Sequence, residues 1–225
     1  MQAIARFEPN RAGRDLAVGD IHGHFSRLRD TLGAVGFDCT RDRLFSVGDL
    51  VDRGPEPQAA LDWLAQPWFH AVRGNHEDYA VRHVMVGRVD PVTYRRNGGG
   101  WFLDLPADRQ REFAMAFAAL PFAIEVSTAQ GIVGIVHADC PYPSWQALAA
   151  GLARRAVRDQ CIWSRARLAA GDAAGVADVR AVVVGHTPVR EPVVLGNVHH
   201  IDTGGWTAQG RFTLLDLATL RPLGS

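Results

Sequence analysis

Five short apolar stretches of this 225-residue chain are each followed by side chains that bind metal ions in proteins. Glycine directly precedes four of the five groups, as expected where a backbone turns sharply and lets another group come close. The mixture of oxygen and nitrogen donors suits Mn, Fe or Zn better than Ca or Mg. In chain order the candidate ligands are Asp20 with His22, Asp49, Asn75, His137 and His186.

The second group lies in the stretch V-G-D-L-V-D-R-G-P, which runs from Val47 to Pro55. It places Asp49, Asp52 and Arg53 directly after a strand-like apolar run. Carboxylates at the mouth of a buried strand are costly unless a metal ion or an arginine lies beside them. If Asp49 bridges two ions about 3.5–4 Å apart, the set matches a hydrolytic two-metal site.

Each of these groups alone has an ordinary interpretation, because an aspartate after a strand usually caps a helix or forms a turn. The elements around them favour a shared site. Three apolar stretches, 16–19, 44–48 and 69–74, alternate with helical patterns at 25–35, 56–66 and 77–85. Such units predict parallel strands whose carboxyl ends open on one edge, where ligands bind.

The rest of the chain is less regular. Residues 97–100, N-G-G-G, predict a flexible loop, and residues 108–120 predict a helix. After residue 121 the spacing changes: strands are expected at 122–126, 132–136, 181–184, 193–194, 199–201 and 211–215, and helices at 144–151 and 155–170. A second, mixed sheet packed on the first is therefore expected, within one domain covering residues 1–225.

Composition excludes several classes of protein. Hydrophobic residues make up 47% of the chain, and the 24 basic residues equal the 24 acidic ones. This balance gives no general electrostatic basis for binding nucleic acid or an anionic membrane. The N-terminus has no apolar signal segment, so we expect a cytoplasmic protein, taken as a monomer. Its three cysteines, Cys39, Cys140 and Cys161, are expected to be free thiols.

The motifs G-D-I-H-G, G-D-L-V-D-R-G, R-G-N-H-E, H-A-D and G-H-T-P occur in this order. They resemble the phosphoprotein phosphatase signature of the calcineurin-like metallophosphoesterases. With N-G-G-G-W-F, I-W-S-R and I-D-T-G, the chain looks most similar to the short bacterial and bacteriophage lambda-type serine/threonine phosphatases. This resemblance covers about residues 18–204. It implies an α/β (α+β) fold in which two mixed β-sheets pack as a sandwich flanked by helices.

The resemblance also implies roles for individual residues. One metal would be bound by Asp20, His22 and Asp49, and the other by Asp49, Asn75, His137 and His186, with two Mn2+ ions preferred and Fe or Zn also suited. A hydroxide bridging the two metals would attack the phosphorus of a phosphoprotein or phosphopeptide directly. His76 would protonate the leaving group, Asp52 would orient His76, and Arg53 and Arg165 would bind the phosphate.

Two other functions stay open. Symmetrical diadenosine tetraphosphate hydrolases share the metal ligands, but in them the family pattern typically has alanine where Asp52 stands here. A metal-binding scaffold without catalysis is the third hypothesis, and the filled catalytic positions argue against it.

Several residues have open or structural interpretations. Arg73 could contribute to the site or form an ion pair with Asp52 or Glu77. Trp101 and Trp145 could line a groove, although large aromatic residues are more often in the core. Packing or surface roles are expected for the histidines outside the motifs, which are His24, His70, His83, His199 and His200.

Overall fold

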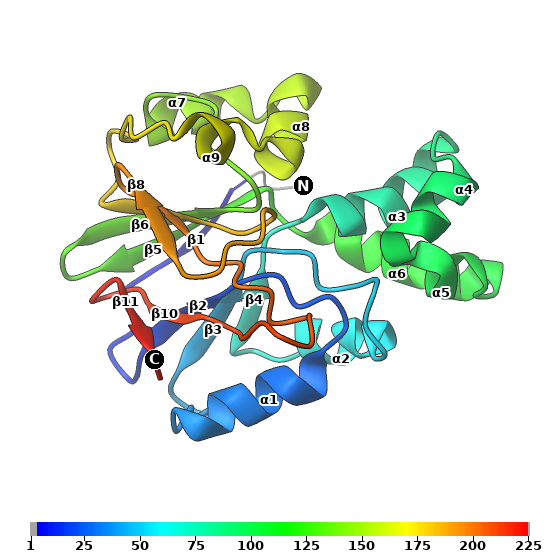
Figure 1. The fold of residues 1–225 in the computed structure, drawn as a ribbon, viewed down its shortest axis with the longest axis horizontal. Coiled ribbons are helices and arrows are strands. Elements are labelled where there is room, and N and C mark those ends of the chain that lie inside the picture. Colours follow the sequence, from blue (N-terminus) through cyan, green and yellow to red (C-terminus); the bar gives the residue numbers. More distant parts are fainter. Residues whose placement is uncertain (1–3, 225) are drawn as a thin grey trace.

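The fold is a sandwich of two mixed β-sheets with helices on both outer faces (Figure 1). The structure is a computed structural model and describes residues 4–224. One sheet has the order β11 (Arg221–Leu223), β10 (Leu214–Asp216), β2 (Asp15–Val18), β3 (Arg43–Ser46) and β4 (Phe69–Ala71). The other has the order β1 (Ile4–Phe7), β5 (Ala123–Thr128), β6 (Gly131–Val136), β7 (Ala181–Val184), β9 (Val198–His200) and β8 (Val193–Leu195).

The helices form two groups on opposite sides of the sandwich (Figure 1). Beside the five-stranded sheet lie α1 (Phe25–Ala34), η1 (Pro57–Ala59), α2 (Ala60–Leu64), α3 (Asn75–Val86), α4 (Pro91–Tyr94), η2 (Arg95–Gly99), α5 (Gly100–Leu103) and α6 (Ala107–Ala119). Beside the six-stranded sheet lie α7 (Trp145–Gly151), α8 (Arg155–Trp163) and α9 (Ala166–Ala170). The predicted fold class is confirmed. Across residues 4–224, every helix falls short of the length and apolar character that crossing a membrane requires.

The predicted parallel units are confirmed, and their register aligns the site loops. β2 pairs with β3, and β3 with β4, in parallel, with Val18 opposite Ser46 and Ser46 opposite Ala71. In the other sheet β6 and β7 are parallel, with Ile135 opposite Val183. Strands in register end together, so the segments that follow them converge at one edge of each sheet.

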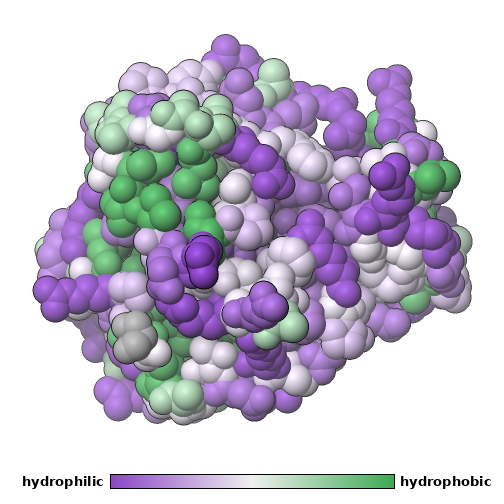
Figure 2. All heavy atoms as spheres, in the orientation of Figure 1, coloured by the Kyte–Doolittle hydropathy of each residue, from purple (hydrophilic) through white to green (hydrophobic). Residues whose placement is uncertain are grey.

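Alternating side chains build the core in layers. Ala181 and Val183 of β7 pack between the two sheets, whereas Val182 and Val184 pack under α7 and α8. This is the period-two pattern of a strand buried on both faces. Hydrophobic residues on the surface are most concentrated over β8, the edge strand, whereas the α3 to α5 region is mainly hydrophilic (Figure 2).

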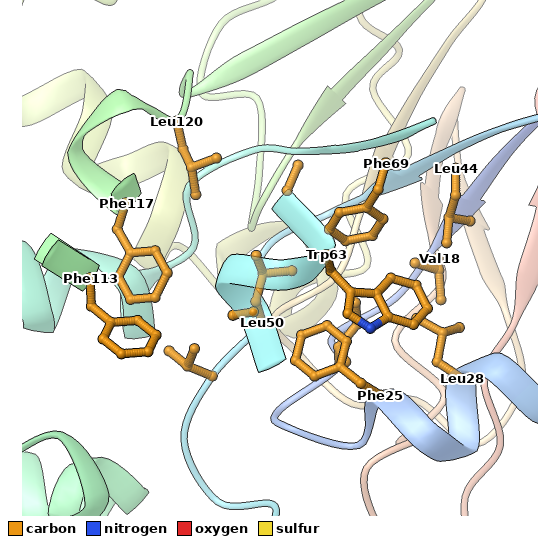
Figure 3. Packing of buried hydrophobic residues seen from close by; sticks show 14 of the residues in the cluster. Val18, Phe25, Leu28, Leu44, Leu50, Trp63, Phe69, Phe113, Phe117 and Leu120 are labelled. Carbon is orange, nitrogen blue, oxygen red and sulfur yellow. The ribbon is translucent and has the colours of Figure 1, made fainter. Parts of the chain in front are cut away.

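A hydrophobic cluster between the five-stranded sheet and its helices anchors the loop after β3. Leu50 is fully buried between the phenylalanines of α6, Phe113 and Phe117, and the aromatic group around Trp63 and Phe25 (Figure 3). Burying a leucine side chain stabilises its position by about 1.5–3 kcal/mol. The burial of Leu50 in the core therefore stabilises the loop that carries Asp49 and Asp52.

Two predicted elements differ from the structure. Residues 97–100 are helical within η2 and α5, with only Gly98 in the left-handed region at φ 103°. The predicted helix 155–170 is two helices, α8 and α9, separated at Ser164 and Arg165. The strands β1 and β11 were not predicted.

Candidate metal and phosphate site

The turns that carry the site residues have unusual backbone conformations. Seven non-glycine residues in the described chain have positive φ, and five of them belong to the predicted site. Such conformations typically cost about 1–3 kcal/mol each and persist only where the surroundings impose them. The five are His22 at φ 45°, Asp49 at 50°, Asp52 at 70°, Arg53 at 64° and His186 at 66°.

Glu77 fixes the backbone around Asp49. Its buried carboxylate accepts hydrogen bonds from the backbone N–H of Asp49 at 3.0 Å, of Leu50 at 2.8 Å and of Gly74 at 2.8 Å. Burial and the neighbouring Asp49 carboxylate raise the pKa of Glu77 to about 7. Because Glu77 lies in the first turn of α3, it ties the loop after β3 to the helix that carries Asn75 and His76.

Asp49 lies between two groups of potential ligands. On one side its Oδ2 is 3.6 Å from His22 Nε2, and Asp20 Oδ2 is 3.9 Å from the same nitrogen. On the other side Asp49 Oδ1 is 3.4 Å from His137 Nε2. The predicted bridging position of Asp49 is therefore geometrically available.

The second group is equally close. His137 Nε2 lies 2.9 Å from Asn75 Oδ1 and 3.2 Å from His186 Nδ1. All six predicted ligands are buried. Two groups of residues each bring their potential metal-binding atoms within 4.8 Å of one another. One group is His22, Asp49 and His76, and the other is Asp49, His137 and His186.

The protonation of the histidines fits a metal site. Nδ1 of His22 donates to the Val51 carbonyl and Nδ1 of His137 to the Val47 carbonyl, both at 2.8 Å. In the neutral imidazole this leaves an Nε2 lone pair directed at the cluster. Among the described residues, the buried Nε2 atoms of His22 and His186 have no hydrogen-bond partner. Buried nitrogen atoms without hydrogen-bond partners, beside carboxylate and amide oxygens, fit the binding of divalent metal ions.

The electrostatics of the site lead to the same conclusion. Burial, the neighbouring His137 and the charge of Arg165 lower the pKa of His186 to about 3. Burial alone would lower the pKa of His137, but the Asp49 carboxylate outweighs burial and raises it to about 9. Burial and the carboxylates of Asp202 and Asp49 raise the pKa of Asp20 well above its usual range. A divalent cation would offset this crowding of carboxylates in place of protons.

His76 differs from the predicted ligand histidines in its partners, which are an aspartate and an arginine. Nδ1 lies 2.6 Å from Asp52 Oδ2, and Nε2 lies 3.1 Å from Arg53 Nη2. Asp52 is completely buried, and its other oxygen accepts a 2.7 Å hydrogen bond from Trp101 Nε1. The predicted contact between Asp52 and His76 is present, and Trp101 extends it to a third residue.

The two predicted phosphate-binding arginines lie on different sides of the cluster. Arg53 is exposed, and its guanidinium lies 4.4 Å above the ring of Trp206. Arg165 is exposed at the start of α9, close enough for its charge to act on His186. Two cations that flank a cluster of ligands can bind separate oxygens of one phosphate group.

Arg73 is not directed at the cluster. Its guanidinium donates to the Ala118 carbonyl, lies 3.6 Å from Asp78 Oδ1 and stacks on Phe122 at 4.6 Å. An ion pair with a carboxylate was one of the two predicted interpretations. The carboxylate in this ion pair is that of Asp78.

His70 and Trp145 have packing roles in the structure. His70 lies between the rings of Phe7 and Phe45, with centroids 4.3 and 5.2 Å away. Trp145 is buried against Gly134 and donates to Glu125.

Two residues at the site were not predicted. The ring of Trp206 packs edge-on against His22 at 4.9 Å. Asp202 is buried, its Oδ2 lacks a hydrogen-bond partner among the described residues, and burial raises its pKa to about 6. Asp202 lies in the motif I-D-T-G, which could have identified it as a site residue. Nothing in the sequence places Trp206 beside His22.

Comparison with known proteins agrees with this site. Residues 14–190 match the family model of the calcineurin-like phosphoesterases. A serine/threonine-protein phosphatase 1 of Salmonella typhimurium is 37% identical over 190 residues, which cover 83% of this chain and 84% of that protein. The chain therefore belongs to the calcineurin-like phosphoesterase family.

Two further comparisons bear on the dinucleotide hydrolases. A symmetrical bis(5'-nucleosyl)-tetraphosphatase of Edwardsiella ictaluri is 44% identical over 64 residues, 28% of this chain and 23% of that protein. A crystal structure of a "putative diadenosine tetraphosphatase" has a TM-score of 0.71 at 22% identity, covering 99% of this chain and 97% of that one. The second similarity concerns the fold alone.

Proposed function

We propose that this protein is a metal-dependent phosphatase that hydrolyses phosphoserine and phosphothreonine in proteins. The observation that carries the proposal is the buried contact between Asp52 and His76 at the edge of the ligand cluster. The resemblance of most of the chain to a relative named serine/threonine-protein phosphatase supports the same substrate class.

The proposed metal ligands are Asp20, His22, Asp49, Asn75, His137 and His186. Two divalent ions bound there would supply positive charge that activates a water molecule and offsets the charge of the phosphate. We propose Mn2+ first, with Fe and Zn also suited to the mixed donor set. Imidazoles oriented by backbone carbonyls and a central carboxylate support this assignment.

In the proposed reaction Arg53 and Arg165 bind phosphate oxygens. Arg53 now contacts His76 Nε2, and a bound phosphate would draw its guanidinium away because a bidentate pair with an anion is stronger. Nε2 of His76 is then free to carry a proton to the departing serine or threonine oxygen. Asp52 accepts a hydrogen bond from Nδ1 of the same ring and fixes its orientation.

The main alternative is symmetrical hydrolysis of diadenosine tetraphosphate. Asp52 is the discriminating residue, because the resemblance places alanine there in those hydrolases. Here Asp52 is buried and bonded to both His76 and Trp101. A structural role for Asp52 in orienting the acid supports the protein phosphatase. The non-catalytic scaffold is disfavoured by the same contacts.

A kinetic comparison tests the substrate assignment. With Mn2+ added, kcat/KM for a phosphoserine peptide should exceed that for diadenosine tetraphosphate. The opposite order would overturn the protein phosphatase assignment and favour the dinucleotide hydrolase. Equal inactivity on both substrates and on p-nitrophenyl phosphate would leave the scaffold as the better account.

We also propose that residues 1–225 act as one domain and as a cytoplasmic monomer. The packing of both sheets around one shared core supports the single domain.

A further inference from the structure

A basic groove lies between α3 and α8, beside the candidate site. It has a volume of about 610 Å³. Its apolar part includes Val81, Phe122 and Leu152. Its charged residues are four arginines and two aspartates, namely Arg73, Arg82, Arg155, Arg158, Asp78 and Asp159. The groove therefore has an excess of positive charge, although the whole chain is neutral.

Two aspartates face four arginines in this groove, and Arg155 Nε lies 3.6 Å from Asp159 Oδ2. Asp78 is shared between Arg73 at 3.6 Å and Arg82 at 3.8 Å. Arg82 Nε is buried and has no hydrogen-bond partner among residues 4–224. Arg158 donates to two backbone carbonyls and, like Arg73, stacks on Phe122, so two cations face one ring. An additional anion would relieve this repulsion.

Helical spacing connects the groove to the site. On α3, Asn75, Asp78 and Arg82 share one face, because residues three or four positions apart are neighbours on a helix. On α8, Arg155, Asp159 and Trp163 share a face in the same way. The ring of Trp163 lies 5.3 Å from Tyr79 of α3 and 6.2 Å from His186. The end of α8 thus lies close to both α3 and the ligand cluster, so the groove between these two helices is adjacent to the cluster.

We infer that this groove binds an acidic side chain of the phosphoprotein segment next to the phosphorylated residue. This inference rests on the proposed function. From Asn75 to Arg82 a helix rises about 10.5 Å at 1.5 Å per residue. An extended peptide covers that distance in about three residues. The preferred carboxylate is therefore about three positions from the phosphoserine, where Arg82 and Arg155 can bind it over an apolar floor.

A peptide series tests the inference. Phosphoserine peptides carry one Glu, two to four positions before or after the phosphoserine, and each is compared with its Gln counterpart in the presence of Mn2+. The expected result is about a tenfold higher kcat/KM for Glu at one of these positions, about 1.4 kcal/mol. The double variant Arg82→Gln with Arg155→Gln should lose this preference but keep its activity on p-nitrophenyl phosphate.

The matched control removes two arginines from α6, with Arg109→Gln and Arg111→Gln, and should keep the preference. If the groove variant does not fold, the salt dependence of the native protein serves instead, since the Glu preference should fall as ionic strength rises. Equal rates for Glu and Gln peptides would overturn the inference about the groove but not the proposed function. A preference for Glu that persists in the groove variant or at high salt would do the same. Hydrolysis of p-nitrophenyl phosphate or diadenosine tetraphosphate without any peptide hydrolysis would overturn the proposed function.

Discussion

The substitution Glu77→Gln probes how the fold holds Asp49 in place. Oε2 of Glu77 accepts from the backbone N–H of both Asp49 and Gly74, and Oε1 accepts from Leu50. A glutamine amide has one oxygen and one NH2 group. Its better orientation keeps the oxygen toward Asp49 and Gly74 and places the NH2 against the Leu50 N–H, so one buried donor loses its acceptor.

The cost follows from these three bonds. An unsatisfied buried N–H costs about 1–3 kcal/mol, and each remaining bond loses about 1 kcal/mol when its acceptor becomes neutral. Removing a buried charge offsets part of this loss of stability, because burial already disfavours the ionised form of Glu77. We expect a net loss of about 2–4 kcal/mol in the free energy of unfolding. For a chain of this size that lowers Tm by about 5–15 °C.

Thermal unfolding of Glu77→Gln is compared with that of Glu112→Gln, whose side chain on α6 is 51% exposed and pairs with Arg109. The control should change Tm by less than about 2 °C, because exposed pairs contribute little. A Mn2+ titration should also show about 10–100-fold weaker binding in Glu77→Gln, the usual effect of losing a support of the ligands. A Tm and a Mn2+ affinity equal to those of the control would refute the assigned role of Glu77.

Three other predictions concern single residues. His76→Asn should retain bound Mn2+ but lose about 10²–10⁴ in kcat, as expected for a general acid; loss of metal, measured by elemental analysis, would make His76 a ligand instead. Trp101→Phe removes the hydrogen bond to Asp52, and kcat for p-nitrophenyl phosphate should fall about tenfold with KM nearly unchanged; an unchanged kcat would show that Asp52 needs no such support. Burial and Arg43 lower the pKa of His70 to about 4. The unfolded chain, with a histidine pKa of about 6.5, therefore binds the proton first, and the stability contributed by neutral His70 declines as pH falls from about 6.5 toward 4. Urea unfolding at pH 7 and 5 should show His70→Phe losing about 1–2 kcal/mol less than the native protein over this interval, after allowance for partial exposure; identical losses would contradict the assignment.

The sequence predicted the parallel strands and the converging ligands because both depend on local pattern. An apolar stretch followed by glycine and a ligand residue marks the end of a strand, and parallel strands bring such ends together. The structure places Asp20, His22, Asp49, Asn75, His137 and His186 in one cluster accordingly.

The N-G-G-G segment was predicted wrongly for a reason that the structure supplies. Gly98 and Gly99 are required by close packing: an added Cβ would lie 2.6 Å from the Arg53 backbone nitrogen in one case and 2.1 Å from the Tyr94 ring in the other. The contact of Gly98 with Arg53 joins segments far apart in the sequence, so composition suggested flexibility instead. The glycines let η2 and α5 pack against the loop that carries Asp52 and Arg53.

Tertiary contacts also explain the other differences. The break between α8 and α9 follows a helix end where the Cys161 carbonyl accepts from the Ala138 backbone N–H. Helical periodicity continues through that point, so it predicted one helix. Trp206 reaches His22 and Arg53 from a loop after β9, and no local pattern encodes that contact.

The proposed function requires that this cluster binds two divalent ions on which phosphate ester hydrolysis depends. Its most direct test titrates metal-free protein with Mn2+ while measuring bound metal and hydrolysis of p-nitrophenyl phosphate on the same samples. We expect two ions per chain, activity that rises with their binding, and loss of activity in EDTA. Full activity in the metal-free protein would contradict it.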